Sequence, residues 1–136
     1  MNKPDNIVCL DVGEKRIGVA VADTSVRIAV PFDTVLVDGN EIESIAKIVV
    51  NERAETIVVG YPRNQSGEAT AQTQYVEEFA SKLKDIASKI VFQDESLTSV
   101  MAEEQLAIHK RPYNKGDIDA QAAAIILQDY IEANYA

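Results

Sequence analysis

The apolar residues near the start of the chain change from a continuous run to an alternating pattern. Residues 7–10 (Ile-Val-Cys-Leu) are all apolar, which is typical of a strand buried on both faces. Over residues 17–21 the apolar side chains alternate with small ones, at the period of a strand. Residues 12–16 separate the two runs and predict a tight turn. We therefore expect a hairpin, followed by a third extended segment at residues 27–37, in which Pro31 favours an edge strand or a bulge.

After residue 37 the pattern alternates between helical and strand spacing. Apolar residues at helical spacing between Ile42 and Val49 indicate an amphipathic helix, and Asn40 with Glu43 fits a capping pattern at its start. The further predicted elements are strands at 56–60 and 89–93, and helices at about 69–85, from 98 or 99 to about 109, and from 117 or 118 onward. An antiparallel meander of three strands followed by alternating strands and helices predicts an α/β fold. We expect one domain over residues 1–136, with a five-stranded mixed sheet and helices on both faces.

The composition is typical of a single globular domain of the cytoplasm. The chain has 136 residues, 46% of them hydrophobic, which is enough for one ordinary core. No apolar run approaches the roughly 18–20 residues that cross a membrane. The N-terminus leads directly into a strand, without the pattern of a secretory signal. Cys9, the single cysteine, is expected to be an inert core residue in a reducing compartment.

The chain is strongly acidic, with a formal net charge of −9 at pH 7. This charge argues against a protein that coats nucleic acid nonspecifically, because phosphate binding usually needs a basic surface. It does not exclude an enzyme that acts on nucleic acid. A carboxylate cluster that holds divalent cations adds negative charge to the sequence, and the bound metal cancels part of it.

Three acidic residues stand where a metal site can form. Asp11 interrupts the first apolar strand, where a carboxylate is costly unless it is hydrogen-bonded, paired or bound to metal. Glu95 lies just past the fifth predicted strand, and Asp119 lies in the first turn of the last helix. Sites in open α/β sheets form beyond the carboxyl ends of the strands, and three carboxylates there would suit Mg²⁺ or Mn²⁺. Two such ions can activate a water and stabilise the leaving oxygen of a phosphodiester.

Each of these acids also has a simpler structural interpretation. Glu95 can lie at a strand end without a further role. Asp119 can be a favourable charge at a helix N-terminus. Asp11 is harder to dismiss, although it can be a hydrogen-bonded structural carboxylate. The three residues together are a stronger signal than any one of them.

Four motifs of the chain closely resemble those of one known family. The matching segments are residues 11–20 (DVGEKRIGVA, for D-x-G-x-K-R-I-G-x-A), residues 59–62 with Gly67 (V-G-x-P…G), residues 94–98 (DESLT, for D-E-R-x-T) and residues 119–123 (DAQAA, for D-x-x-A-A). The chain resembles the YqgF family, also called RuvX, which comprises RuvC-like Holliday-junction resolvases with an RNase H-like fold. One position departs from the family pattern, because Ser96 stands where the family usually has an arginine.

The resemblance implies a nuclease of the two-metal-ion type. It implies that Asp11, Glu95 and Asp119 bind Mg²⁺ or Mn²⁺ and carry catalysis, with Asp94 as a further candidate ligand. Family members are described both as resolvase-like and as nucleases that mature the 5′ end of pre-16S ribosomal RNA. The expected substrate is therefore structured RNA, possibly in a pre-ribosomal particle, with branched DNA as the alternative. The expected protein is a monomer or a homodimer.

Basic residues gather in three predicted loops, where they could bind backbone phosphate. They are Lys15, Arg16, Arg63, Lys110, Arg111 and Lys115. A local basic rim on an acidic protein favours selective binding at one face, and ordinary solvation of loops is the alternative. Tyr61 and Tyr113 could stack on unpaired bases or could simply pack. Gly13 is expected to permit a tight turn, and Gly18 either keeps the sheet surface open for substrate or permits close packing.

Two other functions remain open from the sequence. Ser96 and the acidic charge also fit a nucleic-acid-binding or ribosome-associated factor with little catalysis. A D-x-G hairpin also cradles phosphate in actin-like and sugar-kinase-like nucleotide binders. Those proteins need two such domains, whereas this chain of 136 residues supplies one.

Overall fold

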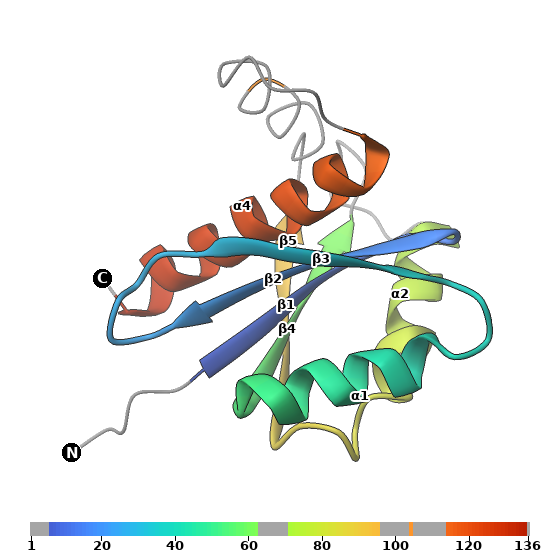
Figure 1. The fold of residues 1–136 in the computed structure, drawn as a ribbon, viewed down its shortest axis with the longest axis horizontal. Coiled ribbons are helices and arrows are strands. Elements are labelled where there is room, and N and C mark those ends of the chain that lie inside the picture. The colour runs from blue at the N-terminus through green and yellow to red at the C-terminus, as the bar shows by residue number, and fades with distance from the viewer. Residues whose placement is uncertain (1–5, 63–70, 96–103, 105–113, 136) are drawn as a thin grey trace.

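One five-stranded sheet forms the centre of the molecule (Figure 1). The computed structural model describes residues 6–62, 71–95, 104 and 114–135, with the backbone alone at residue 95. The strands are β1 (Asn6–Val12), β2 (Arg16–Asp23), β3 (Val30–Leu36), β4 (Ala54–Pro62) and β5 (Lys89–Glu95), in the order β3-β2-β1-β4-β5. The β1–β2 and β2–β3 pairs are antiparallel, whereas β1–β4 and β4–β5 are parallel. The predicted mixed sheet is confirmed.

The β1–β2 hairpin turns at Gly13, as the sequence predicts. The N–H of Gly13 donates to the carbonyl oxygen of Arg16 at 3.0 Å. A Cβ at Gly13 would lie 2.7 Å from that oxygen, so any larger residue would force the turn to shift. Beyond the turn, the register pairs Asp11 with Gly18.

β3 is shorter than the predicted segment 27–37 because Asp23 closes a turn before it. The carboxylate of Asp23 accepts hydrogen bonds from the N–H and the hydroxyl of Ser25, at 2.8 and 2.6 Å. Its carbonyl accepts the N–H of Arg27 at 2.9 Å, and Arg27 has a left-handed φ of 63° that no strand residue adopts. Pro31 lies on the edge strand next to a bulge in the β2–β3 pairing, in agreement with its pattern.

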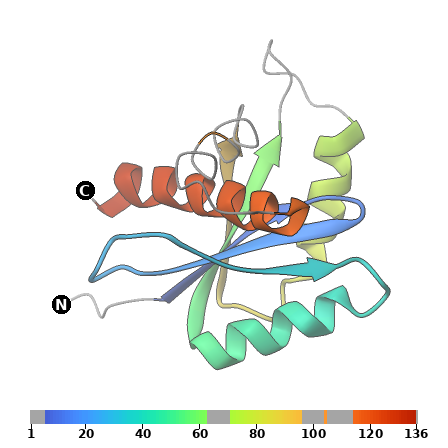
Figure 2. The same cartoon turned by 45° about the horizontal axis from the view of Figure 1, so that its top comes forward.

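Helices cover both faces of the sheet, as predicted (Figures 1 and 2). They are α1 (Glu41–Glu52), α2 (Ala71–Ser81) and α4 (Lys115–Tyr135). α1 and α2 pack on the face that receives Val8 and Leu10 of β1. α4 packs on the opposite face, against Ile7 and Cys9. Alternate residues of β1 thus enter two separate cores, which explains its continuous apolar run, and Cys9 is buried as expected.

α2 ends at Ser81, earlier than the predicted end near residue 85. Past this point the N–H of Leu83 donates to the carbonyl of Ala80 at 3.0 Å, which is the spacing of a tighter turn. Leu83 nevertheless stays fully buried. The helix predicted at 98–109 lies outside the described residues, apart from the helical residue 104. Within the described part of the chain, no helix combines the length and the hydropathy needed to cross a membrane.

α1 begins without the predicted cap from the Asn40 side chain, which makes no capping hydrogen bond. The turn before the helix is held by two acidic side chains instead. The carboxylate of Asp38 accepts the N–H of Asn40, and that of Glu41 accepts the N–H of Gly39, each at 2.9 Å. The capping prediction was therefore wrong because these local bonds satisfy the turn.

Candidate functional site

Asp11 lies near the carboxyl end of β1 and faces α4. Ile7 and Cys9 of the same strand point into the α4 core, and side chains of a strand alternate between faces, so Asp11 follows them on that side. The side chain is only partly exposed. Burial, and secondly the negative charge of Asp119, raise the pKa of Asp11 from 3.8 to about 6. The effect of Asp119 on the pKa of Asp11 places the two acids near each other, as the sequence predicts.

Gly18 brings Asp119 to this position. Gly18 is the register partner of Asp11 on β2, and Asp119 and Ala120 of α4 lie directly over it. Because α4 begins at Lys115, Asp119 lies in the second turn of the helix and not in the first turn, where the sequence placed it. A Cβ at Gly18 would lie 1.9 Å from the carbonyl oxygen of Asp119 and 3.0 Å from the backbone nitrogen of Ala120. Of the two interpretations of Gly18, the structure supports close packing. The missing side chain lets the helix backbone touch the sheet beside Asp11.

Arg16 contacts Asp119 across the hairpin. Its Nε donates to Oδ2 of Asp119 at 2.6 Å, and the two side chains are 33% and 23% exposed. Arg16 is the first residue of β2, and it stands on the same face as Gly18, two residues further on. Arg16 was predicted to bind phosphate, and the structure adds an ion pair that the sequence reasoning missed. No local signal could have found it, because the partners are 103 residues apart.

The start of α4 is fixed by a reciprocal cap. The N–H of Asp117 donates to Oδ1 of Asn114 at 2.9 Å, and the N–H of Asn114 donates to the carboxylate of Asp117 at 3.0 Å. The hydroxyl of Thr34 on β3 donates to the carbonyl of Gly116 at 2.6 Å. α4 therefore starts at Lys115, two residues before the predicted position. The Asn-x-x-Asp spacing was the signal that the sequence analysis did not use.

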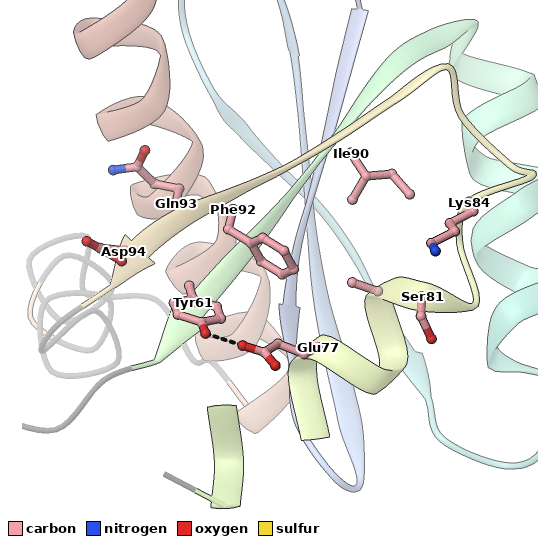
Figure 3. A pocket seen from close by; sticks show the side chains of 9 residues that line it. Tyr61, Glu77, Ser81, Lys84, Ile90, Phe92, Gln93 and Asp94 are labelled. Atoms are coloured by element: carbon pink, nitrogen blue, oxygen red, sulfur yellow. Dashed lines mark hydrogen bonds between the residues drawn. The ribbon is translucent and has the colours of Figure 1, made fainter. Parts of the chain in front are cut away.

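Glu95 and Asp94 end β5, at the same edge of the sheet as the end of β4. Their backbones pair with Pro62 and Tyr61 of the parallel strand β4. Asp94 is exposed and lines a cleft beside α2 (Figure 3), whereas Asp11 faces α4. The described residues hold no cluster of three or more Asp, Glu, His or Cys arranged for a metal ion, and they do not include the Glu95 side chain. Of the three predicted acids, the structure therefore brings two together.

Three of the six predicted basic residues, Lys15, Arg16 and Lys115, lie in the part of the chain that the structure describes. Lys15 is exposed in the β1–β2 turn, and its carbonyl accepts the N–H of Val37 at 3.0 Å. Lys115 is exposed at the first position of α4, next to the contact with β3. The other three predicted phosphate ligands, like Ser96 and Tyr113, lie outside the described residues: they are Arg63, Lys110 and Arg111.

Tyr61 contributes to a cleft of about 770 Å³ on the α2 side of β4 and β5 (Figure 3). Its ring lies 5.0 Å from the ring of Phe92, centroid to centroid, and tilted against it. The Tyr61 hydroxyl donates a hydrogen bond to Oε1 of Glu77 on α2. Tyr61 thus packs within the protein, in agreement with the simpler of its two predicted roles.

Comparisons with known protein sequences agree with the motif resemblance. Residues 5–133 match the sequence model of the RuvX family, whose description is Holliday junction resolvase. A Chloroflexus aurantiacus protein named "Putative pre-16S rRNA nuclease" is 42% identical over 132 residues, which cover 93% of this chain and 86% of the relative. A Synechocystis protein of the same name is 38% identical over 137 residues, which cover 97% of this chain and 90% of the relative.

Solved structures resemble the fold. Thermus thermophilus RuvC in complex with a Holliday junction substrate superposes with a TM-score of 0.58 at 15% identity, covering 95% of this chain and 94% of that one. Fowlpox virus resolvase with its Holliday junction DNA superposes with a TM-score of 0.56 at 14% identity, covering 94% and 97%. Both are RuvC-like resolvases, and the likeness confirms the RNase H-like architecture predicted for this chain.

Proposed function

Because the chain belongs to the RuvX family, we propose that it is a nuclease that hydrolyses phosphodiester bonds with the help of Mg²⁺ or Mn²⁺. Its proposed substrate is the 5′ region of pre-16S ribosomal RNA, in the cytoplasm and in the setting of a pre-ribosomal particle. The name of the relatives supports this choice of RNA. A four-way DNA junction is the second candidate substrate, and the family description favours it.

The pair formed by Asp11 and Asp119 carries the proposal. Two carboxylates converge near the carboxyl end of a central strand, close enough for the charge of Asp119 to raise the pKa of Asp11. Like charges in a partly buried site are unfavourable without a cation between them. Carboxylate oxygens are also the ligands that Mg²⁺ and Mn²⁺ prefer. The described residues therefore fit a divalent cation.

In the proposed site Asp11 and Asp119 hold the cation, with Glu95 at the end of β5 as the third ligand. Asp94, the further candidate, lines the cleft beside α2, and its place there argues against a role as a ligand of the same cation. When bound, the cation would polarise the phosphate and lower the pKa of a bound water. Gly18 sets the distance between the two described acids, because it fixes where the second turn of α4 rests on β2.

The basic residues are proposed to place the nucleic-acid backbone over the acids. Lys15 lies in the turn between β1 and β2, and Lys115 lies at the start of α4, so both are close in sequence to elements that carry Asp11 and Asp119. Arg63, Lys110 and Arg111 complete the proposed set from the adjoining loops. Contacts of this kind orient the strand and carry no sequence information.

A cleavage assay tests the function directly. The full chain is incubated with a 5′ segment of pre-16S RNA or with a four-way DNA junction, in Mg²⁺, in Mn²⁺ or in EDTA. We expect the cation to be required and Asp11→Asn to lower the cleavage rate at least about a hundredfold, since metal-ion catalysis supplies several kcal/mol.

The matched control is Asp85→Asn, which removes an exposed carboxylate from the connection between α2 and β5. It should cleave like the wild type. Equal cleavage by the wild type and Asp11→Asn at saturating Mg²⁺ would contradict the proposal. Cleavage of the DNA junction alone would move the substrate from RNA to branched DNA.

A further inference from the structure

The two acids of the site are neutralised unequally. Oδ2 of Asp119 lies 2.6 Å from Nε of Arg16. No residue in the described part of the chain donates a hydrogen bond to the Asp11 carboxylate or forms an ion pair with it. Arg16 thus compensates the negative charge of Asp119, whereas the charge of Asp11 has no such partner among the described residues.

The Arg16–Asp119 contact is of a kind that can be exchanged. Both side chains are partly exposed, at 33% and 23%, and ion pairs at such positions contribute little net stability. Only Nε takes part in the contact, and among the described residues the two terminal nitrogens of Arg16 make no other hydrogen bond. The Arg16 guanidinium can therefore leave Asp119 without breaking a larger network.

The backbone beneath Arg16 does not need to move for such an exchange. The Gly13 turn closes onto the carbonyl of Arg16 at 3.0 Å, and the N–H of Val37 donates to the carbonyl of Lys15 at 3.0 Å. Arg16 itself pairs with Leu36 in the β2–β3 ladder. Only the long, flexible side chain has to rotate.

We propose that Arg16 is an internal counter-ion that neutralises Asp119 in the metal-free protein and is displaced from it when a divalent cation binds to Asp11 and Asp119. The inference rests on the proposed metal site. It makes Arg16 a competitor of the cation, because Arg16 holds the Asp119 carboxylate until a cation with a higher charge binds there. The released guanidinium would then be available to bind a phosphate group of the substrate.

Cation affinity separates this exchange from a purely structural ion pair. Mn²⁺ alone is titrated into the full chain by calorimetry, without nucleic acid, for the wild type, Arg16→Gln and Lys15→Gln. Lys15→Gln removes the same charge from the neighbouring position without touching Asp119. We expect Arg16→Gln to bind Mn²⁺ about two- to fivefold more tightly than Lys15→Gln, as removal of a competing exposed ion pair predicts. Affinity equal to or weaker than that of Lys15→Gln would overturn the exchange, because a purely structural pair holds Asp119 in place for the metal.

A second measurement uses the wild type, so that it does not depend on the folding of a variant. The Nε–H signal of Arg16 is followed by ¹H–¹⁵N NMR during a Mg²⁺ titration and assigned by its loss in Arg16→Lys. We expect this signal to shift until the site is saturated, while the signal of Arg53 stays in place, because Arg53 caps the C-terminus of α1, which packs on the face opposite α4. An Arg16 signal that is unmoved at saturating Mg²⁺ would overturn the inference.

The outcomes also distinguish this inference from the proposed function. If the wild type binds Mn²⁺ and cleaves RNA, but Arg16→Gln binds Mn²⁺ no more tightly than Lys15→Gln, the proposed exchange is wrong and the proposed nuclease function stands. If the wild type binds no divalent cation, both the exchange and the proposed metal-dependent function are wrong.

Discussion

An acidic side chain lies on each side of the sheet, Asp11 of β1 on the α4 side and Glu77 of α2 on the other, and the two surroundings differ. On the α4 face Asp11 lies next to Asp119, and no described residue donates a hydrogen bond to it. On the α2 face Glu77 borders a cleft of about 770 Å³ and accepts the hydroxyl of Tyr61, whose ring packs on Phe92. The cleft therefore holds the acid that has a hydrogen-bond donor, and the close contact between β2 and α4 holds the acid that has none among the described residues.

In this molecule the candidate site is identified by a carboxylate without a hydrogen-bond donor among the described residues, and not by the presence of a cleft. Glu77 has found its hydrogen-bond donor within the protein. Asp11 is kept partly buried near a second carboxylate, and it has no hydrogen-bond donor among the described residues. Strongly perturbed carboxyl groups are enriched at functional sites for this reason.

The sharpest way to break the comparison is Gly18→Ala. The new Cβ would lie 1.9 Å from a backbone oxygen of Asp119, which cannot move without lifting α4 from the sheet. We expect a loss of about 3 kcal/mol in the free energy of unfolding, at the upper end for overpacked sites, together with a large loss of cleavage. Urea denaturation and the cleavage assay measure the two effects.

Gly116→Ala is the matched control in the same helix. Its Cβ would meet the side chains of Asn114 and Thr34 at 3.1 and 3.2 Å, and these can yield. The higher helix propensity of alanine offsets part of the cost, so stability should change by less than about 1 kcal/mol. An equal loss in both variants would show that the close approach at Gly18 has no special role.

The pH dependence of stability sharpens the comparison on the Asp11 side. The pKa of Asp11 is raised from 3.8 to about 6 on folding, so between these values the folded protein binds a proton more tightly than the unfolded chain. The contribution of Asp11 to stability is therefore greatest below pH 3.8 and falls as the pH rises through about 6. We expect the wild type to lose about 2 kcal/mol relative to Asp11→Asn between pH 4 and pH 7 in EDTA.

Chemical denaturation of the two proteins in parallel at several pH values measures this change. Other titrating groups, Asp129 among them, are common to both proteins and cancel in the difference. If the difference in free energy of unfolding between the wild type and Asp11→Asn is the same at every pH, the surroundings of Asp11 do not destabilise its ionised form.

The smallest expected effect is on the α2 face. Glu77→Gln keeps an oxygen that can accept the Tyr61 hydroxyl, so the free energy of unfolding should change by less than about 1 kcal/mol. Cleavage should stay within about twofold of the wild type, since Glu77 lies on the side of the sheet away from Asp11. A tenfold loss of cleavage in Glu77→Gln would place the chemistry in the cleft and reverse the comparison.

The strands, and Asp11 as a candidate site residue, could be predicted from the sequence because both predictions use the pattern of neighbouring residues. Hydrophobic periodicity in residues 7–21 is enough to predict the first hairpin, and Asp11 is conspicuous as a charge within that pattern. The errors at element ends arose from side-chain bonds over short spans. The turn at Asp23 shortened β3, and the bonds between Asn114 and Asp117 started α4 early.

The geometry of the site could not be predicted in the same way, since it depends on contacts between distant segments. The role of Gly18 follows only from the helix backbone that lies over it. From the sequence, Gly18 could serve either close packing or an open surface for substrate. The partner of Arg16 is 103 residues away. A motif records that such residues belong together, whereas the distances between them come from the fold.

The close contact between Gly18 and α4 also has a consequence for how the molecule is made. Asp119 belongs to the last of the described elements, so the acidic pair cannot assemble until α4 has been synthesised. Contacts of such large sequence separation form late, after the loops that connect them have closed. During synthesis the nascent chain therefore holds Asp11 without Asp119, and the acidic pair forms only when α4 docks over Gly18.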